Sequence, residues 1–212
     1  MKKVAILIDG EWFRIALEND LRGKLPNGIT AEIIYKNALL SVLKSEEVFR
    51  IFYYDCEPPS GKAVNPISRK TVDCTSPAKM NARMRFFAEL GRKPHVALRR
   101  GVVKGRNWVL RMSYVKKLLK DKHAPSLTEN DVMLSMVQKG VDMRIGIDVA
   151  TLSLKKHVDR IILISGDMDM IPAMKLARRE GVQVVVVELD GRKVSQEMVE
   201  DADVLRCITA TT

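Results

Sequence analysis

The chain has 212 residues, the length of one large domain or of a domain with an insertion, and its 46% hydrophobic and 29% charged residues are typical of a globular protein. No apolar run reaches the roughly 18 residues of a transmembrane helix, and Asp9 and Glu11 interrupt the first apolar run too early for a signal peptide, so we expect a cytoplasmic protein without membrane association. The formal net charge of +10 favours a polyanionic partner such as nucleic acid.

The first part of the chain predicts alternating strands and helices. The apolar run at 3–8, which ends at Asp9-Gly10, is typical of a strand buried on both faces of a parallel sheet. Thr30 is a candidate N-cap for a helix. The elements expected up to residue 76 are a strand at 3–8, a helix at 12–21, a loop at 23–28, a helix at 30–43, a strand at 48–54 and a long proline-rich loop at 55–76.

The next stretch carries almost the whole excess of positive charge. Between residues 83 and 122 there are thirteen Lys and Arg residues and two acids, so the rest of the chain is close to neutral. We expect a helix at 77–90, strands at 95–103 and 107–111 joined by a hairpin-like turn at 104–106, a helix at 113–120 and a loop that contains Pro125. A solvated surface would explain scattered charges, but this concentration favours a surface that contacts phosphates, to which we assign Arg99, Arg100, Lys104 and Arg106.

Helices and strands alternate again after residue 130. We expect helices at 131–138 and 144–157, a strand at 160–164, a helix at 170–180, a strand at 182–188, a helix at 194–201 and a strand at 204–207. Apolar strands that alternate with helices indicate βαβ units and a Rossmann-like, mostly parallel sheet flanked by helices. Because the segment 56–122 interrupts this alternation, we expect a single α/β domain over 1–212 with a basic insertion at 56–122.

The sequence has few cysteines and histidines that could form a metal site or a catalytic group. The three cysteines are too far apart for a Cys-x-x-Cys pair, and the three histidines are isolated from one another. A zinc site, a disulfide framework and Ser-His-Asp hydrolysis are therefore disfavoured. A nucleotide-binding Rossmann protein is disfavoured too, since no Gly-x-Gly-x-x-Gly or Walker motif is present.

Acidic residues follow two of the expected parallel strands. Asp9 ends the first strand, and the strand at 160–164 runs into Ser165-Gly166-Asp167-Met168-Asp169. Asp142 and Asp148 flank the start of the helix before that strand. The carboxyl ends of parallel strands meet at one edge of the sheet, where ligands bind, so we expect these acids to converge on one crevice.

Converging carboxylates repel one another unless metal ions or raised pKa values neutralise them. Mg²⁺ and Mn²⁺ take oxygen ligands, and a bound divalent ion both acidifies water and stabilises negative charge on a phosphodiester during hydrolysis. Individually, Asp9, Asp142 and Asp169 also fit a strand-ending turn or helix caps. Lys139 either contacts a phosphate or faces water, and Trp12 either stacks on a base or packs against the sheet.

The order and spacing of three short motifs resemble the NYN domain in its LabA-like branch. The motifs are Ile8-Asp9-Gly10, Lys139-Gly140-Val141-Asp142 with Asp148 six residues later, and 163–169 with the sequence Leu-Ile-Ser-Gly-Asp-Met-Asp. The resemblance covers about 1–55 and 128–208. NYN domains are similar to PIN nucleases, which implies a Rossmann-like fold and an acidic pocket for Mg²⁺ or Mn²⁺. It also implies that Asp9, Asp142, Asp167 and Asp169 are catalytic metal ligands, with Asp148 and Lys139 as accessory residues.

The sequence therefore favours a divalent-metal-dependent ribonuclease, with RNA preferred over DNA as the partner. The alternative is a non-catalytic nucleic-acid-binding or regulatory protein of the LabA-like type that retains the acids. The sequence leaves the oligomeric state open, a homo-oligomer included.

Overall fold

A computed structural model of the chain describes residues 1–24, 28–120 and 126–212. The expected loop tips that contain Pro26 and Pro125 lie outside the described residues. The chain divides into two compact units, which we call the first unit and the second unit. The first unit comprises 1–55, 84–101 and 140–212, and the second comprises 56–83 and 102–139.

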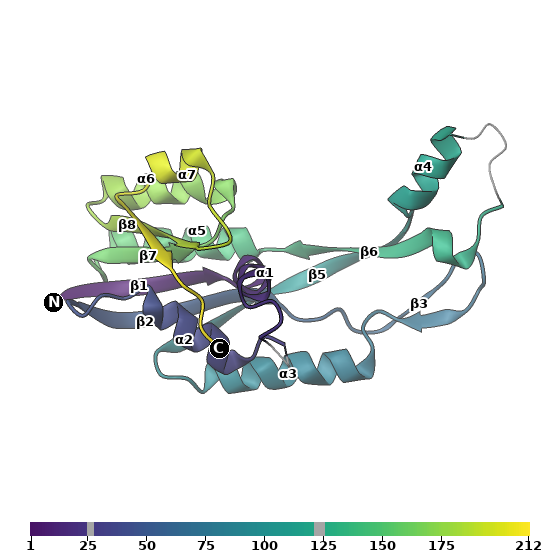
Figure 1. The fold of residues 1–212 in the computed structure, drawn as a ribbon, viewed down its shortest axis with the longest axis horizontal. Coiled ribbons are helices and arrows are strands. Elements are labelled where there is room, and N and C mark those ends of the chain that lie inside the picture. The colour runs from purple at the N-terminus through teal and green to yellow at the C-terminus, as the bar shows by residue number, and fades with distance from the viewer. Residues whose placement is uncertain (25–27, 121–125) are drawn as a thin grey trace. The chain divides into compact units, whose positions relative to one another are not determined.

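The sheet is mostly parallel, as the sequence predicts. Its order is β6-β5-β2-β1-β7-β8-β9, with β1 in the centre (Figure 1). The β1–β2, β1–β7, β7–β8 and β8–β9 pairs are parallel. The strands of the first unit are β1 (Lys2–Asp9), β2 (Glu46–Cys56), β7 (Arg160–Ile164), β8 (Gln183–Leu189), β9 (Val204–Ile208) and the first part of β5 (Val96–Leu110).

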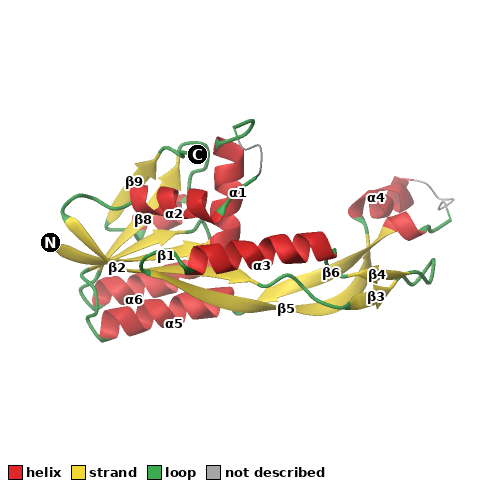
Figure 2. Cartoon of the chain, turned by 90° about the horizontal axis from the view of Figure 1, so that it is seen from below, coloured by secondary structure: helices red, strands yellow, loops and turns green. Residues whose placement is uncertain are grey.

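Helices cover both faces of this sheet (Figure 2). Alternate residues of β1 serve the two layers, because Ile6 and Ile8 join one apolar cluster and Ala5 and Leu7 join the other. The first cluster receives α1 (Gly10–Asp20), α2 (Ala31–Leu40) and the end of α3 (Pro77–Gly91). The second receives α5 (Val141–Leu154), the 3₁₀ turn η2 (Met168–Met170), α6 (Ile171–Arg179) and α7 (Gln196–Glu200).

Helix starts follow the capping residues in the sequence. Thr30 caps α2 as predicted, because its hydroxyl accepts the backbone N–H of Ile33 at 3.3 Å. Asp9 caps α1, and Ser195 caps α7. Asp9 therefore both ends β1 and begins α1, which holds its side chain at the carboxyl end of β1.

The second unit differs from the prediction in three places. Residues 55–76, expected as a loop, contain the antiparallel strands β3 (Lys62–Val64) and β4 (Thr71–Asp73). The expected helix at 131–138 is wrong, because its apolar residues form β6 (Val132–Lys139) after a 3₁₀ turn η1 (Glu129–Asp131). The expected hairpin turn at 104–106 is also wrong, and α4 (Met112–Lys120) follows β5.

The chain passes through 104–106 without turning back. β5 continues to Leu110 and pairs antiparallel with β6, with a register shift between Lys104 and Asn107. The shift leaves two β5 residues opposite one β6 residue, which is the definition of a β-bulge. Gly105, with φ of 84°, supplies the left-handed backbone that the bulge requires. The glycine that suggested a turn therefore marks a bulge.

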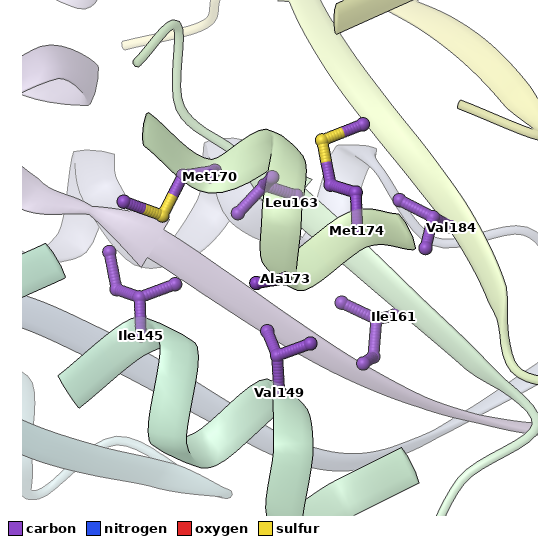
Figure 3. A pocket seen from close by; sticks show the side chains of 8 residues that line it. All are labelled: Ile145, Val149, Ile161, Leu163, Met170, Ala173, Met174 and Val184. Carbon is purple, nitrogen blue, oxygen red and sulfur yellow. The ribbon is translucent and has the colours of Figure 1, made fainter. Parts of the chain in front are cut away.

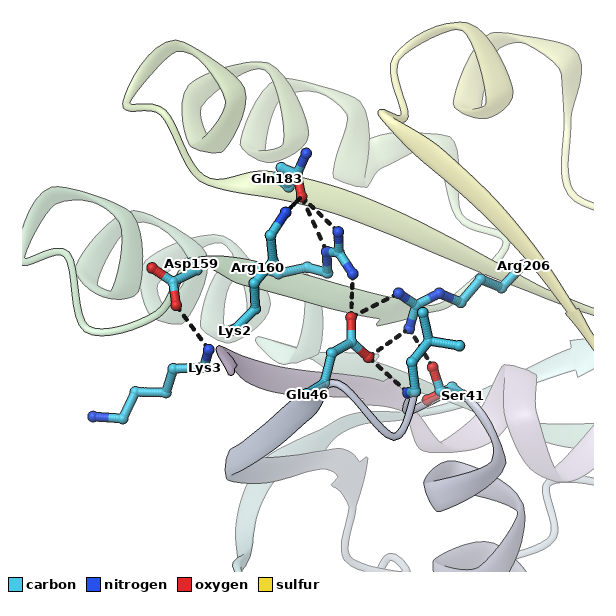
Figure 4. Close-up of polar contacts among 9 residues, drawn as sticks. Lys2, Lys3, Ser41, Glu46, Asp159, Arg160, Gln183 and Arg206 are labelled. Atoms are coloured by element: carbon cyan, nitrogen blue, oxygen red, sulfur yellow. Dashed lines mark hydrogen bonds and ion pairs between the residues drawn. The ribbon is translucent and has the colours of Figure 1, made fainter.

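The amino end of the first unit's sheet carries a buried ion cluster (Figure 4). Glu46, at the start of β2, forms ion pairs with Arg160 of β7 and Arg206 of β9, the latter at 2.7 Å. Arg160 also donates to the Gln183 side chain of β8. The cluster thus joins four strands at one edge. Among the described residues, no helix combines the length and apolar character needed to cross a membrane.

Candidate metal-binding and nuclease site

The carboxyl ends of β1 and β7 form the switch point of the sheet. From β1 the chain proceeds to β2 on one side, whereas β7, β8 and β9 follow one another on the other side. In open parallel sheets this arrangement opens a crevice where ligands bind. Asp9 ends β1 and the Ser165–Asp169 loop follows β7, so both sequence motifs lie at this end of the sheet.

Asp9 is held by the backbone that it caps. Its Oδ1 accepts the N–H groups of Glu11 and Trp12, each at 3.1 Å, and its Oδ2 accepts the Ser165 hydroxyl at 3.3 Å. Burial raises the pKa of the Asp9 carboxyl, while the Trp12 and Ser165 hydrogen bonds oppose the increase. The Asp9 side chain therefore caps α1 and also lies at the candidate site, so the two interpretations of Asp9 do not exclude each other.

The loop after β7 holds its acids in a tight turn. Asp167 caps η2, because its Oδ1 accepts the N–H of Asp169 at 2.9 Å. The N–H of Asp167 in turn donates to the Ser165 hydroxyl at 3.2 Å. Ser165 is fully buried and bonds to both motifs, so it connects Asp9 to the loop that carries Asp167 and Asp169.

Asp142 lies within the first turn of α5, after Gly140 at the N-cap. The pKa of its carboxyl is raised, first by desolvation and then by the negative charges of Asp167 and Asp169. The structure thus brings an acid of α5 towards the two acids of the β7 loop. No described Lys or Arg forms an ion pair with these three carboxylates.

Asp148 has partners of a different kind. Its Oδ2 accepts the Tyr54 hydroxyl and the Nε–H of Arg99, each at 2.8 Å. The Arg99 guanidinium also lies 4.9 Å from the centre of the Phe52 ring. Asp148 therefore binds β2 and β5 to α5, and its charge is compensated by Arg99.

Asp55 is an acid at this edge that the sequence reasoning missed. Its side chain is 2% exposed, accepts the Tyr53 hydroxyl at 3.0 Å and lies 3.6 Å from the Nε of Arg14. Its charge contributes to the raised pKa of Asp9. The signal was available, because Asp55 directly follows the predicted strand at 48–54, as Asp9 follows the first strand.

Two glycines allow this close packing. A Cβ on Gly10 would lie 2.7 Å from Oδ2 of Asp55 and 2.5 Å from the Tyr53 ring. A Cβ on Gly166 would lie 2.2 Å from Nε1 of Trp12. Trp12 is 9% exposed, so it packs against the β7 loop and does not offer an open face for base stacking.

The five basic residues selected from the sequence fall in both units. Arg99 and Arg100 belong to the first unit, whereas Lys104, Arg106 and Lys139 belong to the second. Arg106 donates to the backbone oxygen of Ser60 at 2.9 Å, and Lys104 and Lys139 are exposed. Arg99 and Arg106 are therefore already engaged by neighbours.

Comparison with known proteins adds the family. The model of the NYN domain family matches residues 3–209. The chain belongs to the NYN domain family. NYN domains are part of the PIN-like nuclease superfamily, whose members generally use divalent metals.

Among solved structures, this NYN chain is similar to a protein of unknown function from Vibrio parahaemolyticus. The TM-score is 0.50, the sequence identity is 19%, and the match covers 98% of this chain and 93% of that one. This likeness concerns the fold. No curated protein matches the chain.

The donor types at the NYN site suit a hard divalent cation. Asp142, Asp167 and Asp169 supply carboxylate oxygens, and Mg²⁺ keeps several of its waters when it binds to proteins. Within residues 1–24, 28–120 and 126–212, no three His, Cys, Asp or Glu side chains are close enough to hold a metal ion together. The donor types thus fit a hard divalent cation, whereas the described side chains do not form a set of three direct ligands.

A small cavity between α5, the α6 region, β7 and β8 is part of the core of the NYN domain (Figure 3). It measures about 10 Å³ and is lined only by apolar side chains of α5, the α6 region, β7 and β8, including Ile145, Val149 and Met170. A volume of that size is at the limit for one water molecule, which would find no polar partner there. The space is a packing gap and does not bind substrate.

Proposed function

We propose that the protein is a divalent-metal-dependent ribonuclease of the LabA-like branch, acting through Asp9, Asp142, Asp167 and Asp169. One observation carries the proposal: the pKa of Asp142 is raised by desolvation and then by the charges of Asp167 and Asp169, and no described cation offsets the three charges. Carboxylates brought together without a cation destabilise the folded state, because their like charges repel one another. An external cation would remove that cost.

The four acids bind the cation in this proposal. Asp9, Asp142, Asp167 and Asp169 hold Mg²⁺ or Mn²⁺, directly or through water. Asp9, fixed by the Glu11 and Trp12 amides and the Ser165 hydroxyl, sets the position of the crevice relative to β1. When bound, the cation would acidify water and stabilise the negative charge that develops on the phosphodiester.

The remaining assignments concern the RNA. In this proposal the chain is one domain with a basic insertion at 56–122, whose Lys104 and Arg106 contact phosphates together with Arg100. Asp148 supports the site indirectly, since it orders Arg99 and Tyr54. Lys139 is one more phosphate contact. RNA is preferred to DNA as the substrate class.

A non-catalytic RNA-binding protein is the second candidate. The observation that favours it is the lack, in the described part of the chain, of three acids close enough for direct metal coordination. Such a protein would bind RNA through its basic residues and leave it intact with or without metal.

The test is cleavage of labelled single-stranded RNA with Mn²⁺ or with EDTA, by the natural chain and by Asp9→Asn. Asn keeps an oxygen to accept the Glu11 and Trp12 amides, and its NH₂ can donate to Ser165, so the fold should survive. We expect cleavage that requires Mn²⁺ and falls at least about 100-fold in Asp9→Asn, because one metal-site charge is lost. RNA binding should persist.

The matched control is Glu47→Gln, which removes an exposed acid from the amino end of β2. Its cleavage should equal that of the natural chain. Metal-independent cleavage, or equal cleavage by Asp9→Asn, would contradict the assignment of this site. Binding without any cleavage would support the second candidate.

A further inference from the structure

Arg192 follows β8 at the same edge of the sheet as the acids. β8 ends at Leu189, and a tight turn closed by two backbone hydrogen bonds between Leu189 and Arg192 comes next, at 3.0 and 3.3 Å. Because β8 is parallel to β7, this turn and the Ser165–Asp169 loop leave the sheet at the same edge. A cation thus emerges beside the loop that carries the acids.

Trp12 connects Arg192 to that loop. The guanidinium carbon of Arg192 lies over the Trp12 ring, 5.1 Å from its centre. The same indole packs so tightly on Gly166 that no side chain would fit there. Gly166 lies between Ser165 and Asp167. The Trp12 indole that Arg192 stacks on therefore packs directly against the acidic loop.

Arg192 has no described counter-ion, although its neighbour does. Lys193 pairs with Glu188 at 3.2 Å, whereas no carboxylate in the described ranges pairs with the partly exposed Arg192. Stacking on an indole uses the face of the guanidinium and leaves its N–H groups free to donate. A guanidinium held in one plane is well suited to bind a phosphate through two hydrogen bonds.

We propose that Arg192 binds a phosphate of the RNA backbone at the border of the acidic site and that Trp12 is its positioning residue. The inference rests on the proposed function, whose substrate it places beside the β7 loop. A phosphate that approaches Asp142, Asp167 and Asp169 meets like charge, and Arg192 offsets part of that repulsion. This contact is separate from the basic stretch at 83–122.

The test measures binding of a short, labelled single-stranded RNA in EDTA over a series of salt concentrations, so that no cleavage intervenes. Arg192→Ala should weaken binding about tenfold and reduce the slope of log K against log salt by about 0.7, the contribution of one phosphate contact on a single strand. Arg192→Lys should keep the slope, since it keeps the charge. Lys193→Ala is the matched control and should change the affinity for RNA less than about twofold, because Lys193 already forms an ion pair with Glu188.

Positioning by Trp12 has its own readout. Trp12→Phe keeps an aromatic face and should retain most of the contribution of Arg192, whereas Trp12→Leu should lose it. In the Trp12→Leu background, a further Arg192→Ala change should have little effect, which a role of Trp12 in folding alone does not predict. Equal affinity and slope in Arg192→Ala, or an equal loss in Lys193→Ala, would overturn the inference.

Parallel cleavage assays with Mn²⁺ separate the two proposals. Binding that depends on Arg192 in a protein that cleaves no RNA would overturn the nuclease proposal and support the phosphate contact. Mn²⁺-dependent cleavage with binding indifferent to Arg192 would overturn the phosphate contact alone.

Discussion

The two ends of the first unit's sheet hold carboxylates in opposite electrostatic situations. At the amino end, Glu46 is buried between Arg160 and Arg206 (Figure 4). Desolvation opposes its charged form, but hydrogen bonds from Arg206, the Leu43 backbone and Arg160 lower its pKa to about 2. At the carboxyl end, the pKa of Asp142 is raised by burial and by Asp167 and Asp169. A carboxylate is thus paired with arginines at the amino end of the sheet, whereas carboxylates repel one another at the carboxyl end.

The difference separates a structural cluster from a candidate binding site. A carboxylate that the chain itself neutralises stabilises the fold and has no need of a ligand. Carboxylates that the chain brings together without cations lower stability and gain most from an external one. This contrast is the physical reason for assigning metal binding to the carboxyl end of the sheet.

The largest effect on stability is expected from Glu46→Gln. The change leaves the guanidinium groups of Arg160 and Arg206 buried without a counter-ion, and breaking a buried pair costs about 3–5 kcal/mol. Chemical denaturation should show this loss in the free energy of unfolding at pH 7. Glu47→Gln, next in the chain but exposed, should change it by less than about 0.5 kcal/mol.

The pH dependence of unfolding supplies the control for that prediction. Glu46 has a folded-state pKa of about 2 and an ordinary value of 4.5, so its stabilisation is present above pH 4.5 and is lost as the pH falls towards 2. That shift corresponds to a stabilisation of about 3 kcal/mol above pH 4.5. Glu46→Gln should be less sensitive to acid between these values, and an unchanged acid profile would contradict the cluster's role.

The second prediction concerns the opposite end of the sheet. Mn²⁺ at about 100 times its dissociation constant should stabilise the protein by about 2.7 kcal/mol, which raises the melting temperature by about 5–10 °C. Asp167→Asn keeps an oxygen to cap η2 but removes a charge, so most of the increase should disappear. Glu47→Gln should keep the full increase. A melting curve indifferent to Mn²⁺, or an increase unchanged in Asp167→Asn, would contradict a metal site at this edge.

The sequence predicts the first unit well because its signals are local. A continuous apolar run followed by an acid marks β1 with Asp9 and β7 with Asp167, and the parallel sheet brings these ends together. Asp55, which follows the predicted strand at 48–54, obeys the same rule. For β6 the sequence predicts a helix, because the largely apolar run at 132–137 does not distinguish a helix from a strand. The pairing of β6 with β5 decides the outcome.

Contacts between distant residues lie beyond this kind of reasoning. Asp148 pairs with Arg99, 49 positions away, and Glu46 with Arg206, 160 positions away. A sequence presents each of these as an isolated charge, so it cannot separate a paired arginine from one available to RNA. Composition therefore predicted a basic surface without showing which of its residues are free.

The smallest effects on stability and RNA binding are expected at Lys104 and Arg99. These two residues compare a cation without a described ion pair with a cation that is paired within the fold. Lys104 is exposed on β5 of the second unit, so Lys104→Ala should leave stability within about 0.5 kcal/mol, weaken RNA binding about threefold and lower the salt slope by about 0.7. Arg99→Ala removes the partner of Asp148 and should instead cost about 1 kcal/mol of unfolding free energy with little change in the slope. Denaturation and salt-dependent binding of both variants measure this. If Arg99→Ala lowers the salt slope as much as Lys104→Ala, an arginine paired within the fold still contacts RNA. An ion pair within the protein would then not distinguish a structural charge from one that binds RNA.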